Sequence, residues 1–308
     1  MTGDDRSVSR RAILAATGSA VALSTAGSAH DDESSDETES DWSERLRRCP
    51  EATIQPSMTH CRGASMDGCS DDHPATQKLQ DEVRAALERR YPDIGAIIQQ
   101  GYKPYFDTVF DGDDDDASGG WSHWLNPEYI GDDETLTPDR PESILVDNEW
   151  WRPIGAMFIA TRDGEPIERP PAVYGEGEGE GVSEDEDEDE TETTDERCSP
   201  WHSHTGLPGR FAWWYYRQTY EGAYRDGELL LPCRTPCLLH VWTVPHPDGV
   251  YAHGGPPRAN RGGPPAEDPG FDTDARPGED ELGWDVLPED VVPETKPDEW
   301  RARLGLVS

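Results

Sequence analysis

The chain has 308 residues, a formal net charge of -38 and a hydrophobic fraction of 33%. So strong a negative charge excludes a protein that binds nucleic acid through a basic surface. The apolar fraction lies well below the ~45–50% that is usual for globular domains, so we expect part of the chain to lie outside any core. No apolar run of ~20 residues follows the N-terminal region, so no transmembrane span is predicted in the mature chain.

The basic residues indicate an environment of high salt. Only three of the 27 basic residues are lysines, at Lys78, Lys103 and Lys296, and the others are arginines. Many acidic residues with almost no lysine are typical of proteins that work in concentrated salt, where the Debye length falls to ~3 Å. In dilute buffer the same acidic residues would repel one another and oppose the compact state. We therefore expect a halophilic protein.

The N-terminal region predicts export. Residues 1–29 resemble a twin-arginine signal peptide, because Ser9, Arg10 and Arg11 precede a weakly apolar stretch that ends in small residues. This predicts an extracellular or cell-envelope protein. Residues 30–41 contain acidic and serine residues without an apolar one, as expected of a linker.

We expect one globular domain over residues 42–253. The spacing of apolar residues predicts a helix over 74–90, and Asp93 can cap a second short helix that ends before Gly101. Further along, short apolar runs alternate with turn residues. They predict strands at 143–147, 154–161, 228–231 and 238–244, and a helix over 208–224 whose aromatic residues pack in the core. The order indicates an α+β fold, with short N-terminal helices followed by a mainly antiparallel β domain, a barrel or a sandwich.

Two further segments are predicted to lack a core. Residues 176–196 hold 13 acidic residues among 21 and no aromatic residue, so we expect a disordered acidic insertion. Residues 254–308 are rich in glycine, proline and acidic residues. We expect this tail to be largely disordered, with a short helix near 298–304.

All the cysteines follow the signal peptide, in the part of the chain where disulfides persist. They are Cys49, Cys61, Cys69, Cys198, Cys233 and Cys237. The even number favours disulfides, with at least one bond between the first three and the last three if all are oxidised. As an alternative, Cys233, Cys237 and His240 resemble the dinuclear copper loop of cytochrome oxidase subunit II, in which the histidine comes one residue later and a methionine follows.

Four histidines are candidate ligands of a divalent transition metal. His202 and His204 would face the same side of an extended strand. His240 stands in the middle of an apolar run, where a polar side chain needs a hydrogen-bond partner or a ligand. His123 is a possible fourth ligand. Neutral imidazole suits zinc, copper, iron or manganese, and Asp147 and Glu149 are the candidate carboxylates.

Several segments between residues 101 and 257 together resemble a family of uncharacterised exported proteins from haloarchaea and soil bacteria. They include His123-Trp-Leu-Asn-Pro127, Trp201-His-Ser-His204 and Leu239-His-Val-Trp242. The resemblance covers about half of the chain and implies that the histidine-bearing segments belong to one domain. Because the family has no assigned activity, the resemblance implies no reaction.

Two functions are compatible with these features. The first is an exported halophilic protein with a histidine-based metal site and an unknown reaction. The second is a metal-free, disulfide-stabilised cell-envelope protein that binds a partner or a small molecule. Nucleophile-elbow, phosphate-loop and H-E-x-x-H motifs are absent, so the sequence identifies no enzyme.

Overall fold

The computed structural model describes residues 49–106, 120–175, 197–223 and 230–303. The predicted signal peptide, linker and acidic insertion lie outside these ranges. The described strands are β1 (Met58–His60), β2 (Lys103–Tyr105), β3 (Trp121–Leu125), β4 (Ser143–Asp147), β5 (Arg152–Arg162), β6 (Glu165–Pro166), β7 (His202–His204) and β8 (Cys237–Trp242). The helices are α2 (Pro74–Arg90), α3 (Ile94–Gln99), α4 (Pro127–Ile130), α5 (Leu207–Tyr220) and α6 (Pro297–Arg303), and residues Arg258–Asn260 form a 3-10 turn.

The strands form one eight-stranded sheet in the order β1-β7-β8-β5-β4-β3-β2, with β6 paired to β5. Every strand pair in it is antiparallel. The predicted α+β class with a mainly antiparallel sheet is therefore confirmed. No helix in the described ranges combines the length and the apolar character needed to cross a membrane.

Helix α2 covers one face of the sheet, and its bounds are those that the sequence predicts. His73 caps it, because the Nδ1 atom accepts a hydrogen bond of 3.2 Å from the Ala75 amide. Leu79, Val83 and Leu87 recur one turn apart and pack in the core cluster that also holds alternate residues of β4, β5 and β8. Burying each such side chain contributes ~1.5–3 kcal/mol, so the apolar stripe fixes the face that α2 presents.

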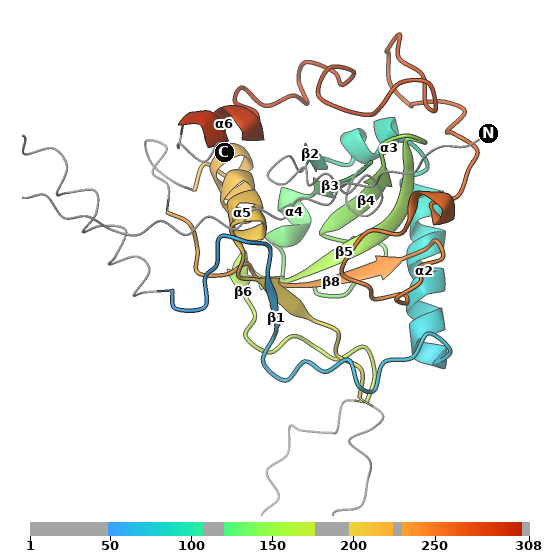
Figure 1. Ribbon diagram of the computed structural model, residues 1–308. Coiled ribbons are helices and arrows are strands. Elements are labelled where there is room, and N and C mark those ends of the chain that lie inside the picture. The colour runs from blue at the N-terminus through green and yellow to red at the C-terminus, as the bar shows by residue number, and fades with distance from the viewer. Residues whose placement is uncertain (1–48, 107–119, 176–196, 224–229, 304–308) are drawn as a thin grey trace, which may run out of the picture. The chain divides into compact units, whose positions relative to one another are not determined.

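Helix α5 covers part of the opposite face, as Figure 1 shows. It lies within the predicted range 208–224, apart from one extra residue at its start. Its aromatic residues Phe211, Trp214 and Tyr215 are buried against β-strand side chains such as Leu145 and Leu238. The prediction that these aromatic residues pack in the core is confirmed.

The sheet is strongly curved toward the face that carries α5. His123 on β3 and His240 on β8 are separated by three strand spacings, ~14 Å in a flat sheet, yet their ring centroids lie 5.9 Å apart. A register shift between Leu145 and Val146 marks a bulge, which increases local bending. Gly155 lets β5 pack closely on β8, since a Cβ atom there would lie 2.8 Å from the Val241 carbonyl oxygen and 3.1 Å from the Trp242 ring. The curved sheet therefore brings side chains from distant strands together on its concave face.

Three disulfides tie the segment before α2 to the part of the chain that follows the acidic insertion. They are Cys49–Cys233, Cys61–Cys237 and Cys69–Cys198. The prediction of disulfides is confirmed, and every bond joins one of the first three cysteines to one of the last three. Because Cys233 and Cys237 are both in disulfides, neither sulfur is a thiolate, and the alternative of a dinuclear copper loop is wrong.

The C-terminal segment differs from its prediction. The sequence predicts a largely disordered tail over 254–308, but in the described part Leu282, Leu287 and Val291 are buried in the core cluster of α2. The amide of Leu282 also donates a 2.8 Å hydrogen bond to the Asn148 carbonyl. Prolines and glycines prevent long helices here, yet single apolar side chains anchor the segment. The predicted short helix is present as α6.

Short strands are the elements that sequence patterns predict least well. Strands β1, β2 and β7 have three residues each, too few for a periodicity to be recognised. The strand predicted over 228–231 is wrong where it can be assessed, because Leu230 and Leu231 belong to no strand. The other two residues of that range lie outside the described chain.

Candidate metal centre

Five histidines meet on the concave face of the sheet. They are His123 on β3, His202 and His204 on β7, His240 on β8, and His253 in the segment after β8. The ring centroids of His202 lie 5.4 Å from His204, 4.8 Å from His253 and 5.6 Å from His240. His123 adjoins the group through His240. The structure therefore brings together all four histidines that the sequence singles out, and it adds a fifth.

Within this group, His202, His204 and His253 form the set that can hold one metal ion. Each offers a ring nitrogen, and the three nitrogens lie within 4.8 Å of one another. The Nε2 atoms of His204 and His253 are 3.4 Å apart. His240 and His123 do not belong to this triad. Three imidazoles in such a cluster are a ligand set suited to zinc, copper, iron or nickel.

His253 is the candidate ligand that the sequence does not predict. It follows a loop that folds back on β8, where the Trp242 amide donates to the Val250 carbonyl at 3.0 Å and Trp242 Nε1 donates to the Ala252 carbonyl at 2.8 Å. These bonds place His253 beside β7. No local pattern around His253 indicates this return, although an aromatic strand residue followed by Pro-Asp-Gly is a turn signal.

The backbone of β7 is held on both sides. Its residues pair with β1 through Met58 opposite His204 and through His60 opposite His202. On the other side His202 pairs with Leu238 of β8. The His204 amide also donates a 2.9 Å hydrogen bond to Thr235 Oγ1. With these constraints His202 and His204 share one face, as the alternation of an extended strand requires.

Gly209 in the first turn of α5 lets this helix approach His204. A Cβ atom at position 209 would lie 2.4 Å from His204 Cβ. Helix propensity alone predicts that Gly209→Ala stabilises the protein by up to ~1 kcal/mol. We expect the opposite sign, with a loss of stability and weaker metal binding, because His204 or α5 must move. Urea unfolding and a metal titration check this, and a stabilised variant with unchanged metal affinity would contradict it.

Burial keeps the histidines neutral. Burial, followed by the neighbouring His253, lowers the pKa of His202 to about 3 and that of His123 to about 4. Burial followed by the other histidines holds the pKa values of His204 and His240 well below the ordinary 6.5. The pKa of His253 is lowered by burial as well. At neutral pH each ring is therefore neutral, with one unprotonated nitrogen that is available as a ligand.

The candidate carboxylates are engaged elsewhere. Asp147 and Arg261 form a buried ion pair with 3.6 Å between Oδ2 and NH1, and Asp147 Oδ1 also accepts a 2.6 Å hydrogen bond from the Trp150 amide. Glu149 pairs with Arg258. Apart from burial, the neighbouring histidines are what lower the pKa values of His123, His202, His204 and His240. A divalent ion bound by the triad would thus keep its full positive charge.

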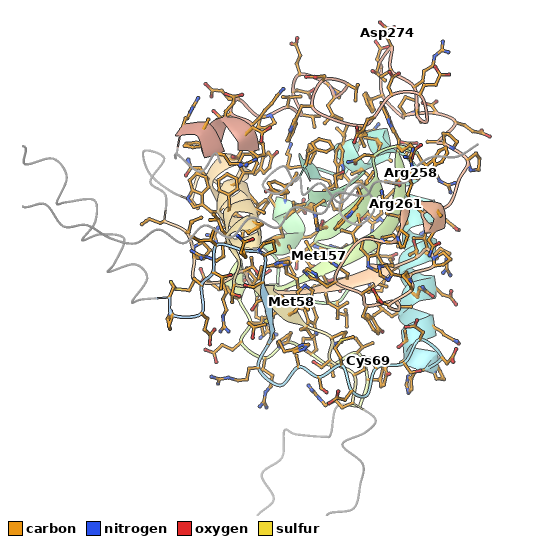
Figure 2. All side chains as sticks on the ribbon, in the orientation of Figure 1. Met58, Cys69, Met157, Arg258, Arg261 and Asp274 are labelled. Carbon is orange, nitrogen blue, oxygen red and sulfur yellow. A yellow bond between two sulfur atoms is a disulfide. The ribbon has the colours of Figure 1, made fainter. Side chains whose placement is uncertain are left out.

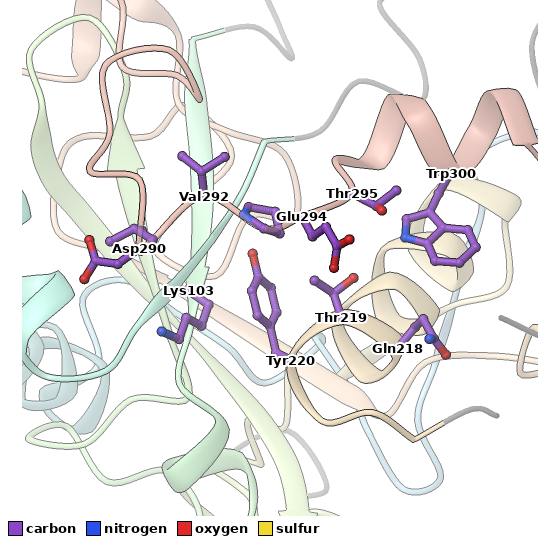
Figure 3. Close-up of a pocket in the computed structure, with 11 residues that line it drawn as sticks. Lys103, Gln218, Thr219, Tyr220, Asp290, Val292, Glu294, Thr295 and Trp300 are labelled. Carbon is purple, nitrogen blue, oxygen red and sulfur yellow. The ribbon is translucent and has the colours of Figure 1, made fainter. Parts of the chain in front are cut away.

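A separate pocket lies beside the C-terminal end of α5, with a volume of about 360 Å³. Figure 3 shows Thr219 and Tyr220 of α5 facing Glu294 and Thr295 of the segment before α6. The lining residues are Lys103, Gln218, Thr219, Tyr220, Asp290, Val291, Val292, Pro293, Glu294, Thr295 and Trp300. None of the five histidines is among them. This pocket brings together no chemically reactive set, so the histidine cluster is the better candidate site.

Comparisons with known proteins identify no relative of this chain. No family model matches the chain, and neither a curated protein nor a solved structure matches it. The class that fold and site define is a disulfide-linked α+β domain with a histidine triad on the concave face of its sheet.

Proposed function

We propose that this protein is an exported, halophilic protein that binds one divalent transition metal through His202, His204 and His253. The observation that carries the proposal is the convergence of three neutral ring nitrogens within 4.8 Å of one another. The three disulfides support an oxidising location outside the cytoplasm. The arginine-rich, acidic composition supports function in concentrated salt, and the N-terminal segment supports the twin-arginine route.

The charge of the site indicates the chemistry that a bound ion would supply. An ion held by three neutral ligands would be electron-poor and would supply Lewis-acid chemistry, including a lower pKa of a bound water. The protein contributes the ligands and a largely apolar surrounding, with Met157 and Leu238 among the buried neighbours on the same face. Figure 2 labels Met157, which lies on β5 opposite His240 of β8. A low-polarity environment strengthens the electrostatic effect of the ion.

Replacing two ligands is expected to abolish metal binding. In the double variant His202→Ala/His204→Ala, the bound metal should fall below about a tenth of an equivalent, because a single remaining imidazole cannot hold the ion. The measurement is a titration with zinc and with cobalt in molar salt, followed by dialysis and elemental analysis. His246→Ala is the matched control, since His246 lies outside the triad. Unchanged binding in the folded double variant would contradict the proposal and favour the metal-free binding protein.

A further inference from the structure

The histidine cluster contains more polar nitrogen than a three-ligand site uses. Both ring nitrogens of His240 are buried and have no hydrogen-bond partner among the described residues. The indole nitrogen of Trp121 is also buried and has no hydrogen-bond partner among the described residues. Buried polar groups are almost always paired, so three orphaned nitrogens in one place call for a ligand. The metal ion alone does not pair them, because His240 is outside the triad and an indole N–H only donates.

These nitrogens border the triad on one side. The His240 ring centroid lies 5.6 Å from His202 and 6.0 Å from His253. Trp121 lies behind it, with its ring centroid 6.3 Å from His240 and 4.7 Å from His123. A small ligand that binds between His240 and the triad would touch the metal position and the unpaired nitrogens at once.

The charge of the site selects the kind of ligand. An ion held by three neutral imidazoles retains two positive charges, and the nearby carboxylates pair with arginines instead. A neutral His240 ring offers one N–H donor, and Trp121 offers a second. Positive charge on one side and N–H donors on the other match a small anion with acceptor atoms at both ends. Hydrogen bonds to a charged group are stronger than those between neutral groups.

We propose that His240 and Trp121 form a binding subsite for a small anion, of azide or bicarbonate size, that coordinates the metal held by His202, His204 and His253. This inference rests on the proposed metal site. It assigns His240 the role of holding the anion, whereas the sequence predicts it to be a metal ligand. His123, 5.9 Å from His240, supports the ring from behind.

The test is an azide titration of the protein loaded with one equivalent of Co²⁺, followed by the visible absorption of the ion. Molar sodium sulfate replaces chloride, because chloride is a small anion that would compete. We expect azide to change the cobalt spectrum of the wild-type protein. In His240→Phe the cobalt affinity should be retained, while azide affinity falls at least ~10-fold, the effect of one lost hydrogen bond to a charge. Trp121→Phe should weaken azide binding in the same direction.

The variants distinguish a failure of the anion subsite from a failure of the metal site. Trp284→Phe is a matched control on the other core cluster, where Trp284 packs against Phe106, and it should bind azide like the wild type. Loss of cobalt from His240→Phe would show that His240 is a ligand and overturn the subsite. Equal azide affinity in His240→Phe, Trp121→Phe and the wild type would overturn it as well. A wild-type protein that takes up no cobalt would overturn the metal site itself, before azide is added.

Discussion

Reduction of the three disulfides is expected to destabilise the protein and to weaken metal binding by the histidine triad. The bonds close loops of 184, 176 and 129 residues, and a single long-loop disulfide contributes ~2–4 kcal/mol. The pair variant Cys61→Ala/Cys237→Ala should therefore lower the melting temperature by ~5–15 °C. This bond joins the end of β1 to the start of β8, three residues before His240, so it holds the strands that carry the site.

The measurement is thermal unfolding in molar salt, before and after treatment with a reductant, with the free thiols counted in the same samples. Bound metal is followed by equilibrium dialysis at a temperature below the transition. Cys69→Ala/Cys198→Ala is a useful comparison, because that bond fixes the chain four residues before His202 at the other end of the site. Full reduction to six thiols with an unchanged melting temperature would show that the disulfides do not support the fold.

Acid is expected to unfold the metal-free protein at a pH where most carboxylates are still ionised. A histidine whose pKa is lowered in the folded state binds its proton more readily in the unfolded chain. Its contribution to stability is complete above the unfolded pKa of 6.5 and is lost as the pH falls toward the folded value. That window runs from 6.5 to about 4 for His123 and to about 3 for His202. Each such group adds a slope of ~1.4 kcal/mol per pH unit within it.

The buried carboxyl group of Glu142 changes the stability of the protein with pH in the opposite direction from the histidines. Burial raises the pKa of Glu142 to about 8, and its Oε2 atom accepts a 3.2 Å hydrogen bond from the Ile159 amide. Its contribution is present below the unfolded pKa of 4.5 and is lost as the pH rises through 8. Glu142→Gln should therefore remove a loss of stability between pH 4.5 and 8 and leave the acid loss in place. Urea unfolding between pH 4.5 and 9 checks both effects, and equal stability of Glu142→Gln at pH 7 and pH 5 would argue against the lowered pKa values of the histidines.

The helices and the longer strands follow from local sequence patterns. Helix α2 has the predicted bounds because a strong apolar stripe, a capping residue and a proline near its end agree with one another. Strand β4 likewise has the predicted bounds. Local agreement of this kind makes an element predictable, since propensity, pattern and turn chemistry indicate the same structure.

The site depends on features that local patterns do not contain. His202 and His204 are predictable from the alternation of a strand, but their strand exists only through pairing with β1 and β8. The curvature of the sheet brings His123 to His240 across two intervening strands. His253 arrives through a loop whose bonds to Trp242 fix its position. The prediction of a largely disordered tail over residues 254–308 is wrong for the described part, because isolated apolar residues such as Leu282 anchor the segment without forming a periodic pattern.

The most direct test is the metal content of the protein secreted by a halophilic host and purified in molar salt without chelator. The triad of His202, His204 and His253 predicts about one equivalent of a single transition metal, lost in His202→Ala/His204→Ala. Metal below about a tenth of an equivalent, in protein that unfolds cooperatively and cannot be reloaded, would contradict the metal site. The histidines would then be metal-free side chains of a binding protein, with His202 and His240 buried and His253 exposed.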